Sequence, residues 1–178
     1  MNSNPVAIAG KLLNLAGCFV YPSAEMAEQL QLDLTDLENN HVRLFMSDRG
    51  GVKAPPYAGC YLDSEDRHRF MINFNGLCLR HGVVLGTSHP PDHIPAMLEA
   101  LTLLSARADD SADLDIFILL DTYYHHWPTA FAAALDQHDR TGFYAALGAE
   151  IKETLVALRH DCLPQGHQSL QSPYALRA

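Results

Sequence analysis

The chain has 178 residues, of which 48% are apolar and 19% are charged. This composition excludes a disordered or low-complexity chain, and the length suits one domain with a sizeable core. The formal net charge is −9, from 12 Lys and Arg against 21 Asp and Glu, and the cations are scattered singly. We therefore expect no nucleic-acid partner and favour basic partners instead. No apolar run approaches the roughly 20 residues that a membrane span needs.

The cysteines are few and irregularly spaced. No two of them have the CxxC spacing of a zinc ribbon or a thioredoxin-type redox motif. They are also too sparse for a scaffold held by disulfides, which predicts reduced, mostly buried thiols in a cytoplasmic protein. The four are Cys18, Cys60, Cys78 and Cys162.

Helical periodicity organises the first part of the chain. Apolar residues recur at i, i+4, i+7 and i+11 and predict one helix face, formed by Ile8, Leu12, Leu15 and Phe19. Ser23 follows a break at Tyr21-Pro22 and is expected to cap the next helix. Helical spacing continues over residues 30–44, where Thr35 and Glu38 have the form of a capping box.

Two breaks divide the middle of the chain. Residues 47–62 are rich in Gly and Pro and predict a long loop. Ser64 is expected to cap a helix that ends near Gly82. The second break, near residues 82–92, is predicted to be a hinge between two helical halves.

The second half is helical in pattern as well. The apolar run Ile116–Leu120 is compatible with a buried strand by composition, but its helical neighbours favour a buried helix. Pro128 allows a new helix to begin, and residues 143–158 form the clearest amphipathic helix. A polar tail begins at about residue 164. We therefore predict one all-α domain over residues 1–178, a bundle of about seven to eight helices.

The segment Ser88–Pro95 is the most unusual in the chain. Its three prolines stiffen the backbone and predict that Asp92 and His93 lie together on a rigid, exposed turn before a helix. Asp92 then either caps that helix, with His93 solvated, or the two side chains together grip an Arg side chain or a peptide backbone.

A second stiff segment precedes it. Pro55-Pro56 is followed by Tyr57 and Tyr61, which either anchor the loop on the helices or form one wall of a peptide groove. Trp127 is the single tryptophan and is expected in the core at a helix junction.

Enzyme motifs are absent from the sequence. There is no GxSxG, no phosphate-binding GxxxxGK[ST] and no HExxH. His89 and His93 are four residues apart, but the prolines between them argue against a shared helix face. A metal-dependent helical enzyme that uses the histidines, and a helical adaptor of another pathway, are the alternative functions.

The order of several short motifs resembles the TorD/DmsD/NarJ family of chaperones for molybdenum-cofactor oxidoreductases. The resemblance covers about residues 5–160. The motifs are His41-Val42-Arg43-Leu44-Phe45, Ala54-Pro55-Pro56-Tyr57 to Tyr61-Leu62, Pro91-Asp92-His93, Trp127 to Phe131, and Phe143-Tyr144 to Leu147.

This resemblance implies an all-helical cytoplasmic protein without catalysis or a required cofactor. Such chaperones bind the immature catalytic subunit, and many hold its N-terminal twin-arginine leader until the cofactor is loaded, which delays export. Relatives are monomers or domain-swapped dimers, and weak guanine-nucleotide binding has been attributed to some.

The family's acidic-Pro-x-Asp-His motif maps onto residues 89–93 of this sequence. His89 departs from it, because several relatives carry Glu at that position. The residues that we expect to bind the partner are Asp92, His93, Pro91, Tyr57, Tyr61 and His89.

Overall fold

The computed structural model describes residues 5–106 and 113–162. These residues form eight α-helices and no β-strand, which confirms the all-α prediction. The helices are α1 (Pro5–Gly17), α2 (Ala24–Leu30), α3 (Leu34–His41), α4 (Ser64–Arg80), α5 (Ile94–Ala106), α6 (Asp113–Tyr123), α7 (Pro128–His138) and α8 (Phe143–Asp161). Two short elements join them, a π-helix η1 (Val42–Met46) and a 3₁₀-helix η2 (Ala58–Tyr61).

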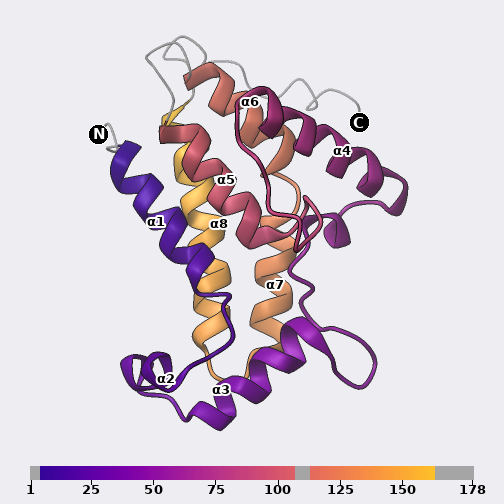
Figure 1. Cartoon of the computed structure of the whole chain (residues 1–178). Helices are drawn as coiled ribbons and strands as arrows, with labels where there is room; N and C mark the ends of the chain where they lie inside the picture. Colours follow the sequence, from indigo (N-terminus) through magenta and orange to yellow (C-terminus); the bar gives the residue numbers. More distant parts are fainter. Residues whose placement is uncertain (1–4, 107–112, 163–178) are drawn as a thin grey trace, which may run out of the picture.

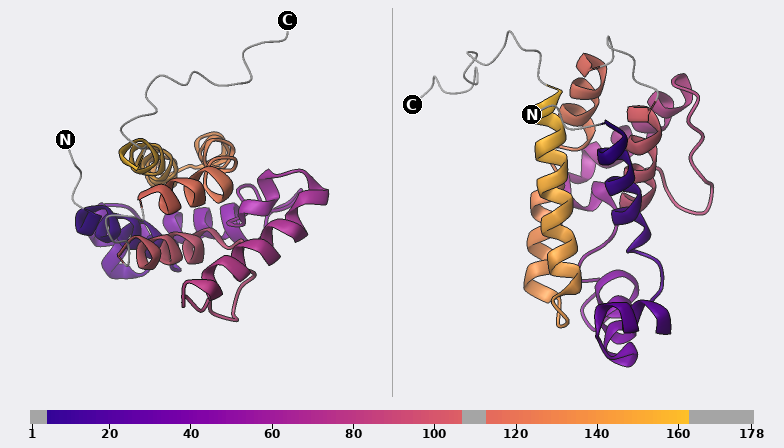
Figure 2. Two further views of the ribbon diagram at one scale, coloured as in Figure 1. Left: turned by 90° about the horizontal axis from the view of Figure 1, so that it is seen from above. Right: turned by 90° about the vertical axis from the view of Figure 1, so that its left-hand side faces the viewer.

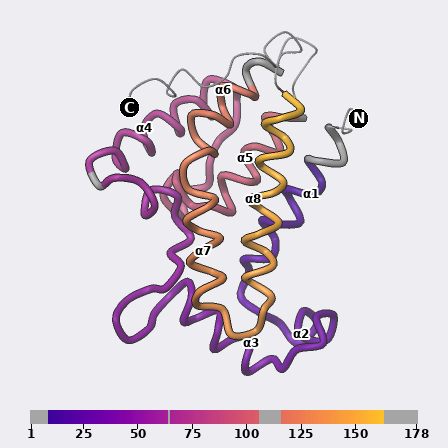
Figure 3. The backbone as a smooth tube through the Cα atoms, turned by 180° about the vertical axis from the view of Figure 1, so that it is seen from behind, coloured from indigo at the N-terminus to yellow at the C-terminus, as the bar shows by residue number. Residues whose placement is uncertain are grey.

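The helices lie in two layers. Seen from above, α6, α7 and α8 form one layer over a second that contains α1, α5 and α4 (Figure 2). Helix α1 packs along α5, and α7 and α8 form an antiparallel hairpin whose turn meets α3 (Figures 1 and 3). Within the described ranges, no helix is both long and apolar enough to cross a membrane.

The core lies between these layers. Its largest fully buried side chains are Trp127, Tyr144, Phe74 and Phe131, so the core position expected for Trp127 is confirmed. Gly148 brings α8 close to α7, since a Cβ there would lie 2.8 Å from Leu135 Cδ1 and 3.1 Å from Ala132 Cα. Helix α4 lies at the edge and leaves Ile72 and Leu79 more than half exposed.

The first helix boundaries follow the sequence only in part. Ser23 caps α2 as predicted, because its hydroxyl accepts a hydrogen bond from Met26 N–H at 3.2 Å. The prediction of a capping box at Thr35 and Glu38 was wrong. Asp33 caps α3 instead and accepts from Asp36 N–H at 3.0 Å, since the helix already begins at Leu34.

The later boundaries agree more closely with the predictions. The cap position of α4 was predicted one residue too late, because Asp63 precedes the helix and Ser64 is already its first residue. Gly82 follows its end with φ of 69°, the left-handed conformation that favours glycine. The run Ile116–Leu120 lies within α6, and Pro128 is the first residue of α7. The loop expected over residues 47–62 contains the short η2.

The link between α4 and α5 spans residues 81–93 and corresponds to the predicted hinge. That two chains exchange halves there stays a prediction. The polar tail from about residue 164 lies outside the described residues.

Candidate functional site

The two unusual loop segments meet in space. Tyr57 and His93 form an isolated antiparallel bridge, in which Ala58 N–H donates to Asp92 O at 2.8 Å and Ile94 N–H donates to Pro56 O at 2.9 Å. We call this contact the loop junction, formed by residues 56–59 and 92–94. It contains three of the six predicted partner-binding residues, namely Tyr57, Asp92 and His93.

Asp92 is the buried centre of the loop junction. Its side chain is 0% exposed, and Oδ2 accepts from Gly59 N–H at 3.2 Å and from Arg67 Nε at 3.1 Å. The exposed turn expected for Asp92 was therefore wrong, and none of its described bonds caps α5. The physical reason is that its carbonyl and carboxylate satisfy two N–H groups at the start of η2, which turns the side chain inward.

Arg67 completes this arrangement from α4. Its side chain is 37% exposed, and its guanidinium carbon lies 5.9 Å from the centre of the Tyr57 ring. Sequence reasoning did not find Arg67, because no motif links residues 67 and 92. Gly59 allows the close approach, since a Cβ there would lie 2.4 Å from Arg67 Cγ and 2.7 Å from Asp92 Oδ2.

The two histidines lie on the outer side of the loop junction. The His89 and His93 rings stack with centres 4.0 Å apart, and Tyr57 lies 5.4 Å from His93. Burial, followed by the nearby charge of His89, lowers the pKa of His93 to about 4. At neutral pH, His93 is thus a neutral imidazole that can donate or accept a hydrogen bond but cannot act as a cation.

Tyr61 serves as an anchor for its loop. Its hydroxyl donates to Pro55 O at 3.0 Å, and its ring packs edge-on against Phe131 at 5.7 Å. Burial raises the pKa of the Tyr61 phenol well above its usual range, so this hydroxyl stays protonated. The exposed remainder of Tyr61 also lines a large cleft.

We call this cleft the aromatic–acidic cleft. It has a volume of about 810 Å³ and lies between η2, the start of α4 and the end of α6. Such a volume falls within the range of ligand-binding pockets. Its lining residues are Cys60, Tyr61, Leu62, Asp63, Asp66, Arg69, Phe70, Asn73, Thr122, Tyr123 and His126.

The cleft combines an apolar wall with negative charge. Phe70 and Tyr123 pack edge to face at 5.4 Å. Asp66 pairs with Arg69, and Asp63 has no ion-pair partner among the described residues. The sequence did not reveal this site, because helical spacing alone places Phe70 on a core stripe and cannot show that the ends of α4 and α6 leave a gap between them.

No group of three or more His, Cys, Asp or Glu side chains in the described ranges is placed to hold a metal ion. His125 and His126, both exposed, have their ring centres 5.3 Å apart.

The model of a known family matches residues 12–141 of the chain, and its description is nitrate reductase delta subunit. The chain therefore belongs to this family, which confirms the resemblance to the TorD/DmsD/NarJ proteins. The chain is also similar to the chaperone protein TorD of Shewanella oneidensis, with 30% identity over 141 residues. That alignment covers 67% of this chain and 62% of the relative, so the chain matches less than two thirds of the relative's length.

A solved structure has the same fold. It is described as a redox enzyme maturation protein from Archaeoglobus fulgidus, and its TM-score to this chain is 0.60 at 21% sequence identity. The superposition covers 88% of this chain and 96% of that one. The names of these two similar proteins describe a chaperone and a maturation protein.

Proposed function

We propose that this chain is a cytoplasmic chaperone that binds the immature catalytic subunit of a molybdenum-cofactor oxidoreductase and catalyses no reaction itself. The family to which the chain belongs and the name of its relative from Shewanella oneidensis support this function. The bound segment is the subunit's N-terminal twin-arginine leader. Holding the leader assists cofactor insertion and delays export until insertion is complete.

The aromatic–acidic cleft is the observation that carries this proposal. A twin-arginine leader presents two guanidinium groups next to an apolar stretch. Asp63 supplies a carboxylate that is unpaired among the described residues, and Asp66 exchanges its exposed pair with Arg69 for a guanidinium group of the leader. Phe70 and Tyr123 supply apolar and aromatic surface. The net charge of −9 further favours the encounter with a cationic segment.

The loop junction borders this cleft through Tyr61, and we assign the remaining predicted residues to that border. Tyr57, His89, His93 and Pro91 contact the leader beyond the cleft. Asp92 does not contact the leader itself. Its buried carboxylate accepts from Gly59 N–H, which fixes η2 and so positions Tyr61. Asp92 is thus a positioning residue in this proposal.

Calorimetry with a synthetic leader peptide tests the proposal. The peptide is taken from the molybdoenzyme encoded beside this protein. We expect saturable binding by the wild-type chain and a loss of about tenfold in affinity for Asp63→Asn or Asp66→Asn, since each removes a charged hydrogen-bond acceptor. Glu150→Gln is the matched control, because it removes one negative charge from an exposed side chain of α8 and should leave the affinity unchanged.

Two results would count against the proposal in different ways. Unchanged affinity in both aspartate variants would remove the cleft from the binding site. Absence of binding to the leader and to the cofactor-free subunit alike would overturn the chaperone function. A leader with both arginines replaced by lysine should bind more weakly, because lysine cannot form the paired hydrogen bonds of a guanidinium.

A further inference from the structure

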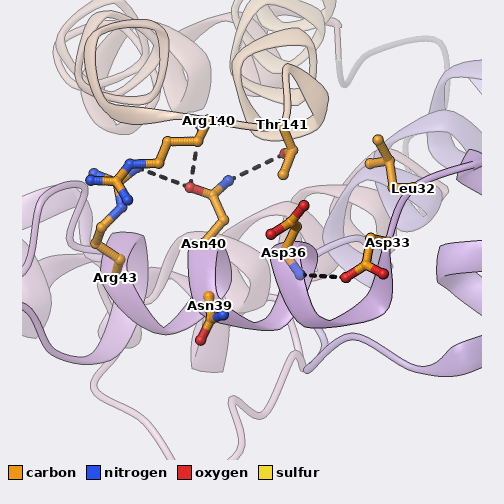
Figure 4. A pocket seen from close by; sticks show the side chains of 8 residues that line it. All are labelled: Leu32, Asp33, Asp36, Asn39, Asn40, Arg43, Arg140 and Thr141. Atoms are coloured by element: carbon orange, nitrogen blue, oxygen red, sulfur yellow. Dashed lines mark hydrogen bonds between the residues drawn. The ribbon is translucent and has the colours of Figure 1, made fainter.

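A second pocket lies at the other end of α7 from the aromatic–acidic cleft. It has a volume of about 390 Å³ and is enclosed by α3 and the α7–α8 turn (Figure 4). We call it the dipolar pocket. Its lining residues are Leu32, Asp33, Asp36, Asn39, Asn40, Arg43, Arg140 and Thr141.

Asn40 forms a fixed wall of this pocket. Its side chain is 3% exposed, its amide donates to Thr141 Oγ1 at 3.2 Å and to Asp139, and its carbonyl accepts from Arg140 N–H at 3.3 Å. Asp139 in turn accepts from Thr141 N–H and Ala145 N–H. The wall is therefore preorganised by bonds that use up the Asp139 carboxylate.

One end of the dipolar pocket is basic. Arg43 extends from η1 and donates to Asn40 Oδ1 at 3.0 Å and to His138 O, while its Nε is buried without a partner in the described structure. Arg140 extends toward the same place from the turn (Figure 4). Neither guanidinium pairs with a carboxylate of the described residues. A buried N–H without an acceptor is costly, so this end of the pocket favours an oxyanion.

The other end is acidic. Asp33 caps α3 with one oxygen, and the Asp36 carboxylate points across the gap toward the turn without an ion-pair partner among the described residues (Figure 4). Asp36, Asn40 and Arg43 follow at i, i+4 and i+7 and thus share one helix face. The rise of a helix separates Asp36 from Arg43 by about 10 Å.

We propose that the dipolar pocket binds a peptide segment that carries one acidic and one basic side chain. The acidic side chain pairs with Arg43 and Arg140, and the basic one pairs with Asp33 and Asp36. A phosphate is a poorer occupant, because its two negative charges would lie in the same small pocket as two carboxylates. This site is independent of the leader proposed for the aromatic–acidic cleft.

The capped tetrapeptide Ac-Glu-Ala-Ala-Arg-NH₂ is a suitable probe. In the polyproline II conformation, which short peptides readily adopt, its two charged side chains lie on one side of the backbone about 9 Å apart. We expect a titration of the ¹⁵N-labelled protein to give saturable NMR shifts at Arg43 Nε and at the Arg140 and Thr141 amides. Replacing Glu by Gln in the peptide, or Arg by Gln, should weaken binding about tenfold. Inorganic phosphate should bind more weakly than the intact peptide.

Variants of the protein show whether a pocket side chain pairs directly with the peptide or only maintains the shape of the pocket. Arg140→Gln should weaken binding of the tetrapeptide and make it insensitive to Glu→Gln in the peptide, as a double-mutant cycle requires of a direct pair. Asp36→Asn should likewise weaken binding of the tetrapeptide and make it insensitive to Arg→Gln in the peptide. Glu150→Gln should leave the affinity for the tetrapeptide unchanged. The proposal is overturned if the peptide gives no saturable shifts, if both peptide variants bind as well as the parent, or if phosphate binds as tightly.

Discussion

The loop junction and the aromatic–acidic cleft share η2, yet they differ in almost every physical respect. The loop junction buries the Asp92 carboxylate completely and pairs one of its oxygens with Gly59 N–H and Arg67. The cleft keeps the Asp63 carboxylate unpaired among the described residues, holds Asp66 in an exposed pair with Arg69, and leaves part of its aromatic surface open. The most unusual motif in this sequence therefore folds into a buried support, and the open cleft lies beside it.

Replacing Asp92 should have the largest effect. Asp92→Ala leaves Gly59 N–H and Arg67 without their buried acceptor, and we expect a loss of about 3 kcal/mol in the free energy of unfolding. Asp121→Ala is the control, because its ion pair with Arg159 is exposed and worth about 1 kcal/mol or less. Chemical denaturation measures both, and equal losses would contradict the distinction between them.

A methyl group at Gly59 tests the same close packing. Gly59→Ala forces Arg67 or Asp92 to move, and we expect a loss of about 2 kcal/mol in stability. Gly76→Ala in α4 should instead be neutral or stabilising by about 0.5–1 kcal/mol. A Cβ at this position would lie 3.7 Å from its nearest neighbour, Arg80 Nη1, which is an ordinary contact distance. Thermal unfolding of the two variants should show shifts of opposite sign or of clearly different size.

Acid should weaken the loop junction. The pKa of His93 is lowered from 6.5 to about 4 on folding, so the unfolded chain binds the proton more readily. Stability is then complete above pH 6.5 and falls as the pH decreases from 6.5 toward 4. His41 is buried against Tyr144 Oη at 3.0 Å, and its lowered pKa acts in the same direction.

The histidine contribution can be isolated by substitution. Because His93 is partly exposed, we expect it to contribute about 1–2 kcal/mol to the difference in unfolding free energy between pH 7 and pH 5. His93→Gln should reduce that difference in denaturation curves. An unchanged pH dependence would mean that the His93 proton is bound equally in both states.

The smallest effects on stability are expected in the cleft. Asp63→Asn and Asp66→Asn alter exposed or half-exposed groups, and each should change the free energy of unfolding by about 0.5 kcal/mol or less. Denaturation at neutral pH measures this directly. A large loss would place these residues in the structural framework together with Asp92.

The sequence predicted what depends on local spacing. Helical periodicity located the helices, and Ser23, Gly82 and Pro128 marked boundaries through their own backbone chemistry. The π-helix η1 was not foreseen, because the apolar spacing around Leu44 fits an ordinary helix equally well. Such local irregularities depend on tertiary packing.

The sites depend on residues far apart in the chain, and there the sequence fell short. It singled out Asp92 and Tyr57, which the fold brings together, but not Arg67, whose guanidinium bonds to Asp92 across 25 positions. The cleft requires the ends of α4 and α6 to face each other, and the dipolar pocket requires α3 to face the α7–α8 turn. Which helix ends face each other cannot be predicted from the residue spacing of a single sequence.

Protection of Cys60 would show whether the leader peptide occupies the cleft, because this thiol is exposed there. Cys78 and Cys162 are buried, and Cys18 is half-buried. Burial raises the pKa of Cys18, which makes it a slower internal reference. Alkylation with iodoacetamide is followed by mass spectrometry with and without the leader peptide. We predict that Cys60 alkylation slows in proportion to the bound fraction while Cys18 is unaffected, and an unchanged Cys60 rate with peptide bound would contradict the account.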